Sequence, residues 1–154
     1  MKIESDDVRI RPFRLQDQTA VKNLILTGLV EYWGSLDPTL NPDLNNIAAS
    51  YANGTFLVAT LHEEIIATGA LIFEKASNVP TGRVVRMSTN KQYRRQGIGY
   101  ILLDALCKVA KDTGYELIVC ETTSTWQNAI TFYLNFGFEI IGEWGGDTHF
   151  QLSI

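Results

Sequence analysis

The chain has 154 residues, 45% of them hydrophobic and 19% charged, and we expect residues 1–154 to form a single globular domain. Its net charge of −4 argues against broad nucleic-acid binding and suits amine-bearing partners. Residues 1–7 lack an apolar signal core and no run of about 18 apolar residues occurs, so we expect no membrane association and place the protein in the cytoplasm.

The first part of the chain predicts a strand and a helix. Polar and apolar side chains alternate over residues 8–12, and Pro12 limits how far this strand continues. Asp17 is placed to cap a helix that we expect to end near Gly28. The apolar face of that helix consists of Ala20, Val21, Leu24 and Ile25.

An irregular segment and a hairpin follow. Residues 31–43 are rich in aromatic residues and turn formers, which predicts a mobile lip over a pocket. Asp43 can cap a further helix that reaches Tyr51. The β-rich runs 55–61 and 65–73 are separated by polar residues and predict an antiparallel hairpin.

A glycine loop, Arg94-Arg95-Gln96-Gly97-Ile98-Gly99, lies between a strand-like run, 83–89, and a helix-periodic run that ends at Gly114. Such a junction leaves backbone N–H groups unpaired at the helix start, where the helix dipole also favours an anion. We therefore interpret the loop as a pyrophosphate site. A Walker loop would need Gly-Lys-Ser or Gly-Lys-Thr and a dinucleotide fingerprint a third glycine, and the sequence has neither.

The last part predicts a strand, a helix and a final hairpin. Residues 117–120 form a continuous apolar run typical of a central strand, joined to 83–89 by a right-handed crossover. Ser124 and Gln127 have capping-box spacing before a helix that ends at Gly137. Two strands close the chain, at 138–144 and 149–154, with a turn at 145–147.

This order of elements, with an Arg-x-x-Gly-x-Gly loop after the fourth strand, resembles the GNAT superfamily of acyl-CoA-dependent N-acetyltransferases. The resemblance covers nearly the whole chain, and its specificity comes from two blocks, 87–99 and 129–138. It implies an α/β (α+β) fold with a mixed sheet of about seven strands and about four flanking helices. The sheet would be mostly antiparallel, with a parallel pair formed by the fourth and fifth strands.

The same resemblance implies an acetyl-CoA site. Backbone amides from about Arg95 to Tyr100 would hold the pyrophosphate, and main-chain groups near Met87 and Thr89 would pair with the pantetheine arm like an added strand. Arg94 or Arg95 would add charge-assisted bonds to phosphate oxygens. The expected coenzyme-contacting residues are Met87, Ser88, Thr89, Arg94, Arg95, Gln96, Gly97, Ile98, Gly99, Tyr100, Asn128 and Tyr133.

Direct acetyl transfer to a primary amine in a ternary complex needs a neutral amine, donors for the oxyanion and a proton for the departing thiolate. The resemblance assigns proton donation to Tyr133. Glu121, twelve positions earlier, has the spacing of the glutamate base in ribosomal-protein N-terminal acetyltransferases and would act directly or through water. The backbone amide near Met87 would donate to the oxyanion. A packed tyrosine and a solvated carboxylate are the alternatives for Tyr133 and Glu121.

The acceptor amine, of a small molecule or of a peptide or protein, is expected to contact Glu31, Tyr32 and Trp33. Asp37 and Asp43 add negative charge that can attract a cation. Family members often carry an asparagine where this chain has Trp126, and Asn128 is offset by two positions. Trp126 can instead cover the cofactor or the acceptor mouth, or pack as a surface aromatic.

The remaining candidates carry less chemistry. Cys107 and Cys120 lie in apolar runs without metal-ligand partners, so we expect reduced core residues and no metal. His62 and His149 form no recognisable nucleophile or metal constellation. Trp144 and Phe150 are expected to be exposed near the last hairpin and to support a possible homodimer.

Two other functions remain open at this point. A non-catalytic acyl-CoA-binding module of the same fold would bind the coenzyme and transfer nothing. A purely structural or interaction domain would have no coenzyme affinity and would need the glycine loop to be accidental.

Overall fold

The computed structural model describes residues 5–37 and 39–154. In this part of the chain seven strands form one sheet, in the order β1-β2-β3-β4-β5-β7-β6. Neighbouring strands are antiparallel except β4 and β5, which run parallel. The strands are β1 (Val8–Pro12), β2 (Thr55–Leu61), β3 (Glu64–Phe73), β4 (Thr81–Thr89), β5 (Leu117–Thr123), β6 (Glu139–Trp144) and β7 (Asp147–Ser153). The predicted mixed sheet is confirmed.

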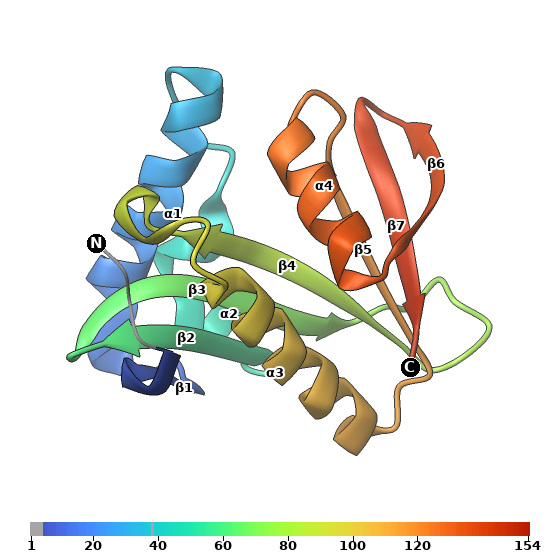
Figure 1. Cartoon of the computed structure of the whole chain (residues 1–154), viewed down its shortest axis with the longest axis horizontal. Coiled ribbons are helices and arrows are strands. Elements are labelled where there is room, and N and C mark those ends of the chain that lie inside the picture. Colours follow the sequence, from blue (N-terminus) through green and yellow to red (C-terminus); the bar gives the residue numbers. More distant parts are fainter. Residues whose placement is uncertain (1–4, 38) are drawn as a thin grey trace.

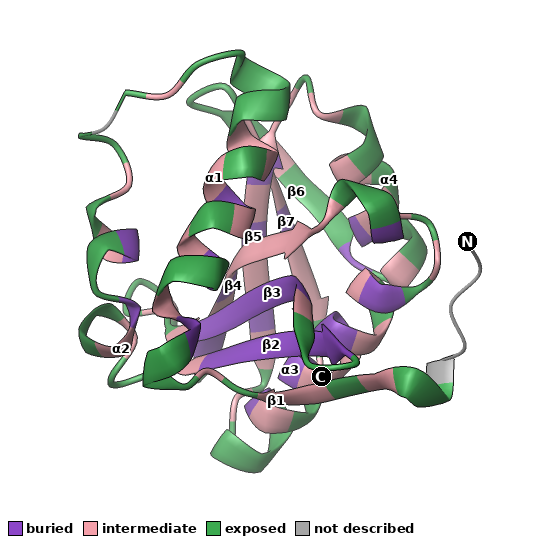
Figure 2. Cartoon of the chain, turned by 90° about the vertical axis from the view of Figure 1, so that its left-hand side faces the viewer, coloured by how far each residue is buried: buried purple, intermediate pink, exposed green. Residues whose placement is uncertain are grey.

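Four α-helices within the described residues cover the two faces of the sheet (Figure 1). They are α1 (Gln18–Trp33), α2 (Ile47–Ser50), α3 (Ile98–Thr113) and α4 (Gln127–Phe136). Short 3₁₀ turns accompany them at Ser5–Asp7, Leu15–Asp17, Pro42–Asn45 and Lys91–Tyr93. The larger core lies between the sheet and α3 and α4, and the smaller one lies under α1 and α2. Figure 2 shows the buried residues of β2 and β3 behind α1.

The first long helix begins directly after Asp17, as predicted, but extends beyond its predicted end. α1 continues through Gly28 and ends at Gly34, which has a left-handed φ of 74°. A Cβ at Gly28 would lie 3.1 Å from the Ser88 hydroxyl oxygen, so this glycine permits close approach of α1 to β4 and does not end the helix. Residues 31–33 therefore belong to a helical turn. Asp17 precedes the helix, but its carboxylate accepts hydrogen bonds from the Arg11 side chain and the Arg14 backbone.

Two predicted caps, Ser124 and Asp43, are wrong. Trp126 is the N-cap of α4 and makes no side-chain capping bond, while the Ser124 hydroxyl lies 2.9 Å from that of Thr148 on β7. The cap of α2 is not Asp43 but Asn46, whose side chain accepts a hydrogen bond from a backbone N–H of the helix. Both predicted caps failed because tertiary partners compete for short polar side chains.

Most other elements match their predictions. The hairpin of β2 and β3 turns at His62 and Glu63, both with positive φ, and α3 ends at Gly114. The last turn is shorter than predicted, since β7 already begins at Asp147. Cys107 and Cys120 are free and buried, as expected.

The predicted pair of exposed aromatics near the last hairpin is half wrong. Phe150 is fully buried in the core, whereas Trp144 is 55% exposed on the edge strand β6. Phe150 alternates with outward-facing neighbours along β7, which places it beneath α4. No helix in the described part of the chain is long and apolar enough to cross a membrane.

Candidate active site

The two parallel strands at the centre of the sheet separate. Their paired register covers Thr81 with Leu117, Gly82 with Ile118 and Arg83 with Val119. Both strands then continue without pairing to each other, and Figure 1 shows β5, β7 and α4 leading away from β4. The β4 edge beyond Arg83 therefore presents unpaired backbone groups, which can accept an extended ligand as an added strand.

The glycine loop lies at the N-terminus of α3. Gly97 is the N-cap of this 16-residue helix and has a φ of 83°, and Arg95 before it also has a positive φ. A Cβ at Gly97 would meet no atom within 4 Å, so the space above the loop is open. The first N–H groups of α3 point into this space without intrahelical partners. The loop thus has the geometry of an anion cradle, and it fits a pyrophosphate.

The two arginines of the loop differ. Arg95 is exposed, whereas the Arg94 guanidinium donates to the Thr89 carbonyl at 3.0 Å and to the Glu31 carboxylate at 2.6 Å. Arg94, predicted to bind the coenzyme, is therefore paired with Glu31, predicted to bind the acceptor. This ion pair connects the end of α1 with the glycine loop.

Tyr133 lies on the inner face of α4 and is 7% exposed. Its ring packs against Phe132, Phe138 and Phe150, with centroids 5.2 to 5.5 Å away. The hydroxyl makes no hydrogen bond to another described residue. It is therefore not itself fully enclosed, since no buried polar side-chain atom among the described residues lacks a partner. Burial, aided by the nearby charge of Glu121, raises the pKa of Tyr133 far above that of an ordinary tyrosine. The hydroxyl therefore keeps its proton at neutral pH.

Glu121 occupies the other face of the sheet. Ile118, Cys120 and Thr122 of β5 are buried on the side of α3 and α4, so the alternating Glu121 faces the side of α1. Its carboxylate forms an ion pair with Arg83 of β4. Tyr133 and Glu121 thus approach the point where β4 and β5 separate from opposite faces.

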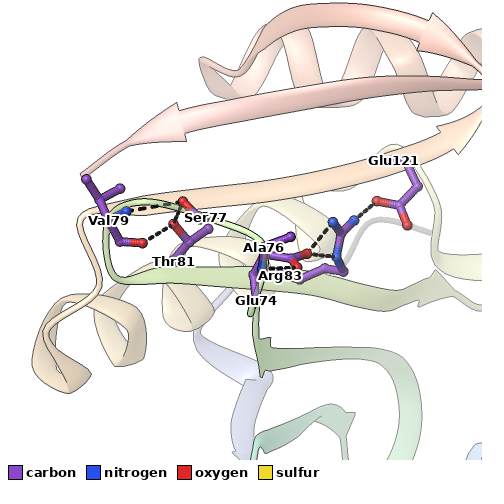
Figure 3. A network of polar contacts seen from close by, with 7 residues as sticks. All are labelled: Glu74, Ala76, Ser77, Val79, Thr81, Arg83 and Glu121. Atoms are coloured by element: carbon purple, nitrogen blue, oxygen red, sulfur yellow. Dashed lines mark hydrogen bonds and ion pairs between the residues drawn. The ribbon is translucent and has the colours of Figure 1, made fainter.

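Arg83 holds a second carboxylate as well (Figure 3). Its Nε donates to Glu74 at 2.6 Å, and the Ala76 backbone N–H, the Arg83 guanidinium and other donors lower the pKa of Glu74. Figure 3 shows the guanidinium between Glu74 and Glu121, which anchors Glu121 at the end of the paired register. Arg83 was not predicted as a site residue, because its partners lie on two other segments of the chain.

An aromatic bridge joins the end of α1 to the start of α4. The Tyr32 ring stacks on Trp126 with centroids 4.2 Å apart, and Trp33 packs against the same indole at 5.4 Å. Tyr32 and Trp33 remain 44% and 49% exposed. The predicted acceptor residues are therefore brought together with Trp126, while Asn128 is exposed on the first turn of α4.

The other predicted acidic residues are already engaged. Asp43 accepts hydrogen bonds from Arg86 at 2.6 and 3.0 Å and from the Tyr51 hydroxyl at 2.6 Å. The Asp37 carboxylate accepts from the backbone and hydroxyl of Thr39. Arg86 has a positive φ at an irregularity in the pairing of β3 with β4. This second ion pair fixes the segment before α2 against β4.

No group of three or more His, Cys, Asp or Glu side chains in the described residues could hold a metal ion. Two surface hollows, one beside Phe13 and Tyr51 and one beside Arg9 and Arg14, are lined by none of the predicted site residues. The candidate site consists of the glycine loop, the open β4 edge and the side chains around it.

Comparison with known proteins identifies the family. The model of the acetyltransferase (GNAT) family matches residues 20–138, well over half of the chain. The chain belongs to the GNAT family. Among curated relatives, this GNAT protein is 34% identical over 110 residues to N-acetyltransferase 8F1 of Rattus norvegicus and 32% identical over 113 residues to N-acetyltransferase 8B of the same species. The matches cover 68% of the chain and 49% and 50% of those relatives, so the chain spans about half their length.

Solved structures show the same fold. An acetyltransferase of the GNAT family from Staphylococcus aureus Mu50 has a TM-score of 0.84 at 24% identity, covering 95% of this GNAT protein and 98% of that chain. The PaiA N-acetyltransferase of Thermoplasma acidophilum, solved in complex with coenzyme A, has a TM-score of 0.81 at 17% identity, with 96% and 99% covered. The order of strands and helices is therefore that of the family along nearly the whole chain.

Proposed function

We propose that this protein is an N-acetyltransferase that moves an acetyl group from acetyl-CoA to a primary amine by direct transfer in a ternary complex. The observation that carries the proposal is the unpaired edge of β4 beside an open glycine loop. Tyr133 and Glu121 lie on opposite faces of the sheet at the same opening. Membership of the GNAT family and the coenzyme A complex of the Thermoplasma neighbour support it.

The chain's own residues divide the work of binding the coenzyme. The backbone N–H groups at the start of α3 would hold the pyrophosphate, assisted by the exposed Arg95. Main-chain groups of β4 near Met87 and Thr89 would pair with the pantetheine arm. Acetyl-CoA supplies the activated thioester. Arg94 would reach a phosphate after exchanging its bond to Glu31.

Tyr133 and Glu121 would divide the proton transfers between the two faces. Tyr133 would protonate the departing sulfur, because its hydroxyl stays protonated and makes no hydrogen bond to another described residue. Glu121 would attract the ammonium group of the acceptor and lead its proton away, directly or through water. The acceptor can be a small molecule or a peptide or protein amine.

The first test is calorimetric titration with acetyl-CoA, followed on the same sample by a thiol-release screen over amines, amino acids, polyamines and N-terminal peptides. Binding with release would establish the transferase. Binding without release to any acceptor would favour a non-catalytic acyl-CoA-binding module. Absence of binding would overturn the assignment of the glycine loop.

A matched pair of glycine variants sharpens the titration. Gly97 and Gly114 lie at opposite ends of α3, both with left-handed φ and open space around a new Cβ. Gly97→Ala and Gly114→Ala should therefore cost similar stability, about 1–2 kcal/mol. Only Gly97→Ala adds a methyl group to the proposed phosphate space, so only it should weaken acetyl-CoA binding, by about tenfold or more. Equal affinities for the two variants would count against the site.

A further inference from the structure

His149, for which the sequence indicates no function, lies beside Glu121 in the sheet. The antiparallel register of β5 and β7 places Glu121 directly opposite His149. Residues directly opposite each other in such a pair project to the same face. Thr148 and Phe150, on either side of His149, are buried toward the core under α3 and α4. His149 therefore faces the side of α1, where the acceptor is proposed to enter.

The imidazole is held in one orientation. Its ring stacks on the indole of Trp144 with centroids 3.6 Å apart and an interplanar angle of 8°. Its Nε2 lies 3.3 Å from the Trp144 carbonyl oxygen. A carbonyl oxygen can only accept a hydrogen bond, so this contact requires the proton on Nε2. The neutral ring then has its lone pair on Nδ1, which is the nitrogen able to take up a proton.

The charges around His149 come from four strands and are mainly negative. Glu121 lies opposite on β5, with Arg83 of β4 bound to its far side. Asp147 shares the face of His149 on β7, and Glu139 of β6 receives a hydrogen bond from the next outward residue of β7. Gly142 and Trp144, the β6 residues nearest the imidazole, carry no charge. This surface would attract an ammonium group.

Glu121 and His149 differ in their partners. The Glu121 carboxylate forms an ion pair with Arg83, whereas His149 makes no ion pair among the described residues and has a ring nitrogen, Nδ1, free of the contact with Trp144. The chain thus places an anionic group to bind the amine next to a neutral group to deprotonate it.

We propose that Nδ1 of His149 takes the proton from the acceptor ammonium, while Glu121 binds and orients that ammonium. The inference rests on the proposed function and moves one of its steps, removal of the acceptor's proton, from Glu121 to His149. The first proton passes from nitrogen to His149 and then to water. The second leaves the nitrogen for water as the C–N bond forms, and Tyr133 gives its proton to sulfur as the C–S bond breaks and is reprotonated by water. The overall products are an amide, a thiol and one proton.

The test compares four proteins with 2-phenylethylamine, spermidine and an alanyl peptide as acceptors: wild type, His149→Gln, Glu121→Gln and His62→Gln. His62 lies in the exposed hairpin turn of β2 and β3 and serves as the control. Thiol release is measured from pH 5 to 9, and acetyl-CoA affinity is measured by calorimetry. Wild type should show an acidic limb, in which kcat/KM falls as the pH is lowered, because a protonated base cannot take up the acceptor's proton.

His149→Gln should lower kcat by about 10²-fold or more and remove that acidic limb, with unchanged acetyl-CoA affinity. Glu121→Gln should mainly raise KM for the amine and keep the limb. A smaller variant, His149→Ala, should regain part of its activity with added imidazole. Normal turnover and an unchanged limb in His149→Gln would overturn the inference alone, whereas no thiol release by wild type would overturn the proposed function with it.

Discussion

Replacing Tyr133 with phenylalanine separates packing from proton donation. The ring would keep its contacts with the three surrounding phenylalanines, whose centroids lie 5.2 to 5.5 Å away. The lost hydroxyl has no hydrogen-bond partner among the described residues, so no partner is left unsatisfied. The free energy of unfolding should therefore change by less than about 1 kcal/mol, which corresponds to about 2–4 °C in Tm.

Turnover should respond much more strongly. Loss of a general acid lowers kcat by about 10²–10⁴-fold, equal to about 3–5 kcal/mol of barrier. Because burial raises the pKa of Tyr133, the wild-type enzyme should also keep this proton donor above pH 10, the ordinary range of tyrosine. The reasoning thus predicts a large kinetic effect with a small thermal one.

The assay is thiol release at saturating acetyl-CoA, with Tm measured on the same preparations. Tyr115→Phe is the matched control, because that ring packs against Phe73, with centroids 6.5 Å apart, before β5 begins. The control should turn over like wild type. If Tyr133→Phe did so too, proton donation by Tyr133 would be refuted and the ring would be a packing residue only.

Other outcomes follow from contacts elsewhere. Hydrogen bonds from Arg11 lower the pKa of Asp17, so its stabilisation is fully present above the unfolded value near 3.9 and is lost progressively as the pH falls from there through the lower folded value. Asp17→Asn should cost about 1–3 kcal/mol in melts at pH 7 and progressively less as the pH is lowered below about 4. Arg94→Gln should weaken acetyl-CoA binding in calorimetry, whereas Glu31→Gln should leave it unchanged or tighter, because the freed guanidinium can turn to phosphate. Leu102→Ala, at a fully buried position of α3, should cost about 2–5 kcal/mol in chemical denaturation.

The order of elements could be predicted because each strand and helix carries its own periodicity. Gly114 and Gly137 end helices as their positions indicate, since both adopt positive φ at the turn. The predicted helix end at Gly28 is wrong because glycine also permits close packing. Only the position of Ser88 on β4 shows which role this glycine has. A glycine in a helical pattern therefore has two meanings that the local sequence does not separate.

The sequence predicts several individual residues of the candidate site, but it does not predict the contacts between them. Glu121 and its partner Arg83 are 38 residues apart, and Arg94 and its partner Glu31 are 63 apart. Such distant pairs leave no periodic signal in the sequence. His149 was set aside for the same reason, since the β5–β7 register alone brings it opposite Glu121. His149 directly precedes the buried Phe150 in a strand whose residues alternate between the two faces. This alternation is the signal that could have placed His149 on the outer face.

The separation of β4 and β5 also bears on solubility. An unpaired strand edge at the outside of a sheet invites pairing with other protein chains. Here the open edge of β4 lies in the middle of the sheet order, with β5 joined to it at one end, while the Tyr32–Trp126 stack connects the helices that flank the other end. The strand edge of a second sheet cannot reach the open part of β4, because β5 and the flanking helices limit the space, whereas a single extended ligand can. The opening between β4 and β5 thus offers backbone hydrogen bonds to a slender ligand without offering them to a neighbouring protein.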